Sequence, residues 1–370
     1  GTYGPGLEDV KHPLAPEMAE TPLTLNGVST SAAKPWADLP QATLDHLAFV
    51  HHATNTNSHP NHPKSMRLQG SVVGNEMLLS ALAKETATGL MTTQAEPVSL
   101  GAGGSELISF EGRRLSNVSP TGLQRALQAP DAPDLASLRD QTLDGLYALY
   151  KARGGRKHIR MLDAFARTRR EAKQVNVSLL DLLAGIDDQE KTDQEIAAAS
   201  VLAAMNLTPV ITIKIRFGGD NHADADLEDE TTETVTGVAY VQKLIDSLNA
   251  LTTQGVLTNE VVVASMNVFG RTMSLQRKGL NGRDHNPNHH CMLIHGPNIR
   301  GGVVGGIEAF GRDFAAAPFD ASTGAIDESG VPRSESYEAA AKTLGCAVGV
   351  AESRLDELII GGRPATSILG

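Results

Sequence analysis

Two short segments of the chain each place a carboxylate and an imidazole beside a glycine turn. Asp220 and His222 follow the strand-like run at 211–217, and Asp284 and His285 lie in a turn rich in glycine and asparagine. In an extended backbone, residues i and i+2 point to the same side, so Asp220 and His222 can face one ion. Oxygen and nitrogen ligands of this kind suit zinc or manganese. The two pairs together predict a metal site on the loops of a sheet.

Each pair also has a plainer interpretation, because either one alone is typical of a polar loop. Pro287 follows the Asp284-His285 pair and cannot continue a helix. His285 and His289 are therefore not predicted to be ligands spaced by one helical turn. The occurrence of two carboxylate–imidazole pairs, each at a turn, is what favours a metal site over a polar loop.

Three further side chains are candidates for handling an anionic ester at such a site. Arg271 and Arg283 carry fixed positive charge that would stabilise an oxyanion. Thr54 begins a loop of hydroxyls and imidazoles, and a hydroxyl there becomes a nucleophile once a metal lowers its pKa. The alternatives are structural ion pairs for the two arginines and a hydrogen-bonded turn for the loop.

The acidic residues at 220–233 and the two cysteines have structural interpretations. The acidic run lacks the glycine of a calcium-binding loop and precedes a predicted helix, whose N-terminus favours negative charge. Cys291 and Cys346 lie among apolar residues, which is typical of buried thiols. A disulfide between them stays open, because two cysteines define no framework.

The composition narrows the classes of partner. The chain has 370 residues, of which 41% are hydrophobic and 20% charged, and its formal net charge is −11. It has no basic stripe, so nucleic acid is not an expected partner. No apolar run reaches about 18 residues, so no transmembrane segment is expected. A small anionic ester would have to be attracted by a local metal or arginine, against the overall charge.

The apolar pattern predicts an α/β fold whose strands end near the candidate residues. Buried strands are expected at 44–50, 211–217, 261–265 and 291–294, with two short strands inside 97–110. Helices are expected at 75–90, 135–150, 161–165, 232–251 and 334–344.

The order of these elements favours a three-layer α/β/α sandwich. Continuous β-branched runs are typical of parallel strands that are buried on both faces, so the sheet is expected to be mainly parallel. Residues 1–40 are predicted to be an extended segment that lies on a single domain at 41–370. That domain is expected to carry a helical insertion at about 120–205.

Several segments, in their order and spacing, resemble a bacterial branch of the alkaline phosphatase and sulfatase superfamily. They are residues 261–272, 282–287 and 299–302, and residues 219–222 are similar to that branch's Gly-Trp-Asp-Thr-His signature. The resemblance implies a two-metal site in an α/β/α sandwich. Asp220 and His222 would match ligands of one ion, and Asp284 and His285 those of the other. Thr54 would lie near the nucleophile position.

The resemblance also implies a function and a location. The branch has a late histidine where this chain reads Val-Pro-Arg-Ser at 331–334, so the metal site is expected to be incomplete. The expected activity is metal-dependent hydrolysis of phosphate or sulfate esters. The alternative is a catalytically inactive binding or structural protein that keeps the hydrolase fold. Members of the branch are often exported, which implies a periplasmic or cell-surface location, with a homo-oligomer or larger assembly as partner.

Overall fold

The central sheet of the computed structural model has four strands, in the order β10–β13–β4–β14. The structure describes residues 2–3, 15–100, 109–115, 117–127, 133–155, 159, 162, 182–184, 186, 189–217, 221–224, 226–273 and 282–370. The strands are β4 (Leu47–His52), β10 (Val263–Ala264), β13 (His290–His295) and β14 (Gly302–Val304). β13 is antiparallel to both β10 and β4, and β14 is parallel to β4.

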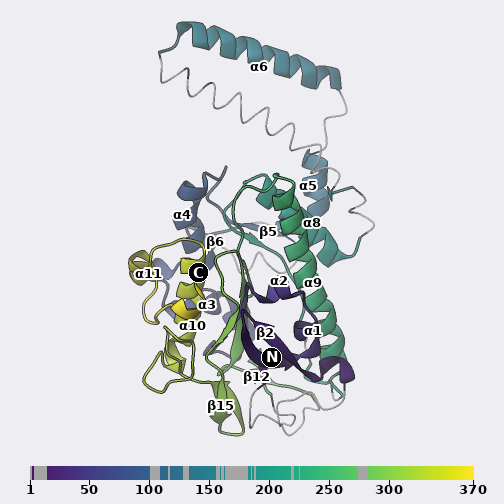
Figure 1. Cartoon of the computed structure of the whole chain (residues 1–370). Helices are drawn as coiled ribbons and strands as arrows, with labels where there is room; N and C mark the ends of the chain where they lie inside the picture. Colours follow the sequence, from purple (N-terminus) through teal and green to yellow (C-terminus); the bar gives the residue numbers. More distant parts are fainter. Residues whose placement is uncertain are drawn as a thin grey trace.

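β4 and β13 form the middle of the core because apolar side chains alternate to both faces of the pair. Ala48 and Val50 pack with Met292 and with Tyr337 of α10 (Ser336–Ala347). On the other face, Phe49 packs with the N-terminal segment and with α9 (Glu228–Thr253). Figure 1 shows α9 as the long helix that runs along this side of the body. The C-terminal end of β4 and the N-terminal end of β13 therefore lie side by side, with His52 opposite His290.

The described part of the N-terminal segment contains a hairpin, and the prediction that residues 1–40 are an extended segment lying on the domain stays a prediction. β2 (Glu20–Leu25) pairs with β3 (Val28–Ala33), and β3 also pairs with β1 (Thr2–Tyr3). Asn26 and Gly27 both have positive φ, 46° and 82°, as the favoured two-residue hairpin turn requires. The Asn-Gly dipeptide is a hairpin signal in the sequence that the many prolines obscured.

Within the described residues, the remaining strands form four smaller sheets. β5 (Val98–Leu100) pairs in parallel with β8 (Asn117–Val118) and with β9 (Ile211–Thr212). The antiparallel pairs are β6 (Ser109–Phe110) with β7 (Arg113–Arg114), β11 (Gly270–Arg271) with β12 (His285–Asn286), and β15 (Ile307–Phe310) with β16 (Asp313–Ala316). The pair β11–β12 is the one that holds predicted site residues.

The helices lie close to their predicted positions wherever the structure describes the chain. The predictions at 75–90, 135–150, 232–251 and 334–344 correspond to α4 (Leu78–Leu90), α6 (Pro133–Arg153), α9 and α10. The other α-helices in the described part of the chain are α1 (Lys34–Ala37), α2 (Gln41–Leu44), α3 (His62–Ser65), α5 (Pro120–Leu127), α8 (Lys191–Ala204) and α11 (Glu352–Leu358). The helix expected at 161–165 falls almost wholly outside the described residues. None of the described helices has the length and apolarity that a membrane span needs.

The structure supports a mixed α/β fold, and it corrects the predicted strand directions. β10 and β13, expected to be parallel strands, are antiparallel neighbours, and the expected strand at 211–217 is reduced to β9. An apolar run reports that both faces of a strand are covered, but it carries no information on the direction of the partner strand. The three-layer sandwich with a mainly parallel sheet is not confirmed, and the single domain at 41–370 stays a prediction.

Candidate metal site

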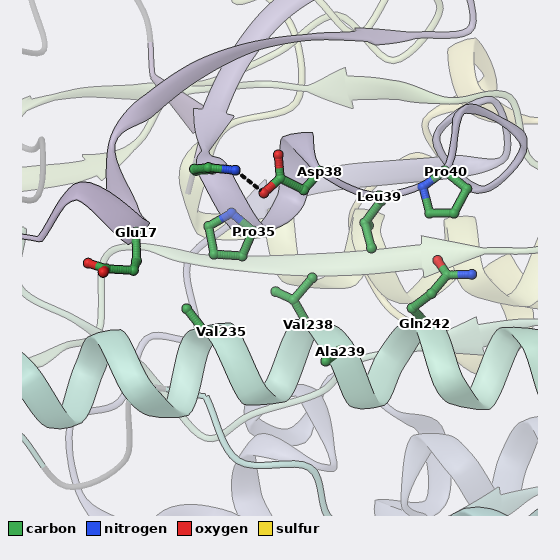
Figure 2. Close-up of a pocket in the computed structure, with 10 residues that line it drawn as sticks. Glu17, Pro35, Asp38, Leu39, Pro40, Val235, Val238, Ala239 and Gln242 are labelled. Atoms are coloured by element: carbon green, nitrogen blue, oxygen red, sulfur yellow. Dashed lines mark hydrogen bonds and ion pairs between the residues drawn. The ribbon is translucent and has the colours of Figure 1, made fainter.

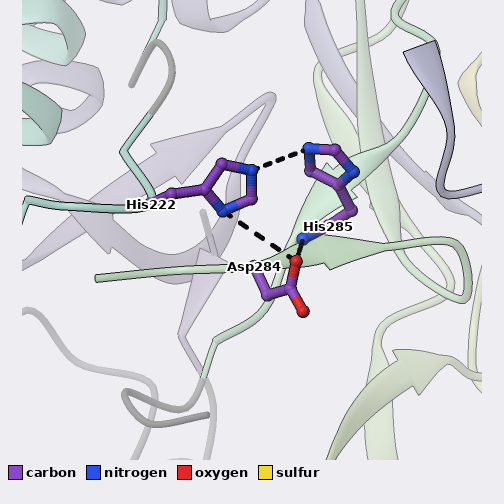
Figure 3. Close-up of side chains that lie close together, drawn as sticks. All are labelled: His222, Asp284 and His285. Carbon is purple, nitrogen blue, oxygen red and sulfur yellow. Dashed lines mark hydrogen bonds and ion pairs between the residues drawn. The ribbon is translucent and has the colours of Figure 1, made fainter. Parts of the chain in front are cut away.

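Three of the predicted site residues meet at one point. His222, Asp284 and His285 each offer a ligand atom within 4.8 Å of the others, and Figure 3 shows the three side chains facing one another. The two Nε2 atoms are 3.0 Å apart, and Nδ1 of His222 lies 3.9 Å from Oδ1 of Asp284. All three residues are partly buried. Residues from two distant segments thus form a group of two imidazoles and one carboxylate.

Backbone hydrogen bonds bring the two segments together. The amide of Gly282 donates to the carbonyl of His222 at 3.0 Å, and that of Arg283 donates to the carbonyl of Asn221 at 3.0 Å. A Cβ on Gly282 would lie 2.0 Å from the Asn221 oxygen, so only glycine allows this approach. Glu230 of α9 links the two segments through its side chain. Its Oε2 accepts from Nδ2 of Asn221 at 2.7 Å and from Nε of Arg283 at 2.5 Å.

The short ladder of β11 and β12 sets the position of His285. Arg271 lies opposite His285 in the register, and Gly270 lies opposite Asn286. Beyond the ladder, the amide of Thr272 donates to the carbonyl of Asp284 at 2.8 Å, and the amide of Asp284 donates to Oγ1 of Thr272 at 2.9 Å. The backbone of the Asp284-His285 pair is therefore held on both sides of the candidate ligands.

The tautomer of His285 follows from its second nitrogen. Nδ1 lies 2.6 Å from the carbonyl oxygen of Asn57, and because a carbonyl only accepts, Nδ1 carries the proton. Nε2 then presents a lone pair toward His222. Burial lowers the pKa of His285, and the nearby Arg271 lowers it further, which favours the neutral ring. The ring of Phe269 stacks on that of His285 with centroids 3.8 Å apart and limits its rotation.

Arg271 adds a positive charge to the group. Its Nη1 lies 3.3 Å from Nε2 of His222, and because a guanidinium only donates, this nitrogen of His222 presents a lone pair. Nε2 of His285 lies 3.0 Å from the same nitrogen of His222, whose single lone pair can point to only one partner. A metal ion bound between the two imidazoles would therefore replace the contact of His222 with Arg271.

The other predicted residues have different positions. Asp220 lies outside the described residues. The guanidinium of Arg283 is buried and donates to Glu230 and to the carbonyls of Thr272 at 3.0 Å and Met273 at 2.5 Å. These contacts favour a structural role for Arg283, one of the two alternatives open for each arginine, because they occupy its donors within the fold.

Thr54 follows β4 and is fully buried. Its Oγ1 lies 3.4 Å from the carbonyl oxygen of Thr56, and the next amide, that of Asn55, donates to the carbonyl of Pro287 at 2.9 Å. The loop after β4 is thus fastened to the segment that follows His285. The role of Thr54 as nucleophile stays a prediction, and it would require the loop to open.

Sequence reasoning missed the residues that support the three candidate ligands. Phe269 lies two residues before Arg271, where the sequence singles out only the arginine, and Glu230 lies in the acidic run whose pattern favours a helix start. Asn57 acts through its backbone carbonyl, which leaves no trace in the choice of side chain.

A pocket of about 420 Å³ lies between α1 and α9 and shares no residue with the group of His222, Asp284 and His285. It is lined by Pro35, Leu39, Val235 and Val238 among others (Figure 2).

The comparisons with known proteins identify a family and correct the resemblance drawn from the sequence. A family model described as "Protein of unknown function (DUF1501)" matches residues 48–323. No curated protein and no solved structure matched the chain. Nothing in these comparisons supports the alkaline phosphatase and sulfatase superfamily, so that assignment was wrong, because short motifs outweighed the thin similarity elsewhere. Export to the periplasm or the cell surface stays a prediction. The match spans more than half of the chain, which therefore belongs to the DUF1501 family.

Proposed function

We propose that the chain binds a divalent metal ion, zinc or manganese, between His222, Asp284 and His285 and uses it to hydrolyse phosphate or sulfate esters. The observation that carries this proposal is the pair of imidazole nitrogens that face each other at 3.0 Å, one of them with its tautomer set by a backbone carbonyl. Metal-binding histidines commonly donate their other N–H to such an acceptor.

The donor set fits the ion. Two imidazoles and one carboxylate are a ligand set of catalytic zinc sites, which keep a further position open for water or substrate. When bound, the ion would polarise an ester oxygen and lower the pKa of a coordinated water molecule. Arg271 would orient the anionic ester, since its guanidinium places a positive charge beside the ligands in a chain whose net charge is −11. Asp284 is held against the amide of His285 at 2.7 Å, which directs its carboxylate toward the group.

A second candidate function is binding without catalysis. The full burial of Thr54 favours it, because the predicted nucleophile exposes no surface to a substrate. In that case the chain would hold a metal or an anionic ligand but would not turn an ester over. Assembly into a homo-oligomer also stays a prediction.

Metal analysis of the purified chain after loading with zinc or manganese tests the proposal. We expect about one equivalent in the wild type and less than about a tenth in His285→Ala. His46→Gln is the matched control, because His46 is exposed and its Nδ1 pairs with the carbonyl of Ile299, away from the three ligands. A wild type that retains less than about a tenth of an equivalent would overturn the proposal. Turnover of aryl phosphate and aryl sulfate esters by the loaded chain then separates catalysis from binding.

A further inference from the structure

We infer that Arg271 and the proposed metal ion compete for one nitrogen of His222, and that the displaced guanidinium then binds the anionic group of the ester. The ion and the anion therefore bind cooperatively. The inference rests on the proposed metal site and deepens it, because it states how occupation of that site is regulated.

Nε2 of His222 has two neighbours that exclude each other as partners. Nη1 of Arg271 lies 3.3 Å from this atom, and Nε2 of His285 lies 3.0 Å from it. A guanidinium only donates, so Arg271 needs the lone pair of His222. An ion bound between the two imidazoles needs the same lone pair, because a metal-binding imidazole coordinates through an unprotonated nitrogen. Arg271 and the ion therefore cannot both hold this nitrogen.

The backbone keeps Arg271 beside the site when its contact with His222 is lost. Arg271 lies opposite His285 in the ladder of β11 and β12, and the next amide, that of Thr272, donates to the carbonyl of Asp284 at 2.8 Å. The side chain itself is partly exposed and can change its rotamer while the backbone stays in place. The displaced guanidinium thus remains within reach of an anion that is bound to the ion.

The charges of Arg271 and of the ion couple the binding of metal to the binding of anion. A divalent ion and a guanidinium that are close together repel each other, and partial burial strengthens this repulsion. An anion that contacts both removes it, as in sites where arginine and a metal clamp a phosphoryl group. By linkage, each ligand raises the affinity for the other by the same factor.

Direct binding of the anion to the ion, with no part for Arg271, is the alternative. Arg271→Gln separates the two, because it removes the charge that competes for His222 and keeps a polar side chain. Arg113→Gln is the matched control, because it also removes one positive charge. Arg113 lies in β7, pairs with Glu96 at 2.8 Å, and belongs to the β6–β7 hairpin, which is well apart from β12 in Figure 1.

The measurement is the zinc dissociation constant, by competition with a chromophoric chelator, in sodium sulfate and in sodium chloride of equal ionic strength. We expect sulfate to tighten zinc binding by the wild type at least about fivefold. In chloride, Arg271→Gln should bind zinc at least about fivefold more tightly than the wild type, and sulfate should then change its affinity by less than about twofold. Arg113→Gln should match the wild type in both salts.

Three results would show that the inference is wrong while the proposed metal site stands. Sulfate could leave the zinc affinity of the wild type unchanged, it could tighten zinc binding equally in the wild type and in Arg271→Gln, or Arg271→Gln could bind zinc no more tightly than the wild type in chloride. A wild type that binds no zinc in either salt overturns both the inference and the metal site.

Discussion

The backbone carbonyl of Asn57 and Nδ1 of His285 lie 2.6 Å apart, and this contact joins the loop after β4 to the strand β12. It sets which nitrogen of His285 carries the proton and so which one is open to a ligand. Two parts of the chain that are 228 positions apart meet there.

The ring of Phe269 is expected to contribute to metal affinity without touching the ion. Phe269→Leu keeps an apolar side chain but removes the flat surface that stacks on His285. We expect zinc binding to weaken about tenfold, as for other groups that orient a ligand. Phe269→Tyr should bind zinc like the wild type. Equal dissociation constants for all three chains would remove Phe269 from this role.

Arg271 is expected to bind the anion rather than the metal. Arg271→Gln should weaken inhibition by inorganic phosphate by about 10- to 100-fold, because a charge-assisted hydrogen bond is worth roughly 1.5–3 kcal/mol. Zinc affinity should stay the same or increase, since a positive charge beside His222 is removed. Phosphate inhibition constants and zinc titrations measure the two effects separately. A variant that loses zinc but keeps phosphate binding would contradict the assignment.

The ion pair between Arg283 and Glu230 is expected to stabilise the contact between residues 221–222 and residues 282–285, which carry the candidate ligands. The Arg283 side chain is 8% exposed and that of Glu230 is 16% exposed. Removing one partner of a buried pair leaves the other charge uncompensated, so Arg283→Met should lower the free energy of unfolding by about 2–4 kcal/mol. Urea unfolding measures this. The double variant Arg283→Met with Glu230→Leu should recover part of the loss.

Gly282 and Gly270 are expected to tolerate no side chain. A Cβ at Gly282 would lie 2.0 Å from the Asn221 oxygen, and one at Gly270 would lie 1.9 Å from the His289 oxygen. Alanine at Gly282 should separate residues 282–285 from residues 221–224, alanine at Gly270 should push β11 away from His289, and both should abolish metal binding. Gly89→Ala in α4 is the control, because no atom lies within 4 Å of its Cβ position, and it should raise stability by about 1 kcal/mol. Metal content and thermal unfolding of the three variants check this.

A second group of histidines is expected to make the fold sensitive to acid. His51, His52, His289 and His290 lie at the paired ends of β4 and β13, and Nδ1 of His51 is 2.9 Å from Nε2 of His289. Burial lowers the pKa of His51 and His290 to about 4, and it lowers the pKa values of His52 and His289 as well. The folded chain therefore keeps these rings neutral, whereas the unfolded chain protonates them near pH 6.5.

The sign of the effect follows from this difference. Between about pH 6.5 and 4 the unfolded state binds more protons, so the free energy of unfolding falls as pH falls, by up to roughly 1.4 kcal/mol per pH unit for each histidine. Urea unfolding at pH 7, 6 and 5 measures the slope. His52→Phe keeps the ring that stacks on Tyr337 with centroids 4.7 Å apart and should reduce the slope. An unchanged slope would show that His52 does not contribute.

The local pattern of the sequence was enough for four of the described helices and for the identity of three candidate ligands. Apolar residues at helical spacing located α4, α9 and α10, because a helix is set by residues near one another in the chain. The carboxylate–imidazole pairs identified three residues that meet in space. The Asn26-Gly27 turn was also present in the sequence, although it was overlooked.

The tertiary structure decided which of these residues act together and in which chemical form. Strand direction depends on contacts between distant segments, so the antiparallel pairing of β10 and β13 could not be read from their apolar runs. The proton on His285 depends on a carbonyl that any residue at position 57 would provide. Arg271 and Arg283 look alike in sequence, and only their neighbours separate them: Arg271 lies against His222, whereas Arg283 is enclosed by Glu230 and backbone carbonyls. Residue types are local, but the partners that set charge and protonation are not.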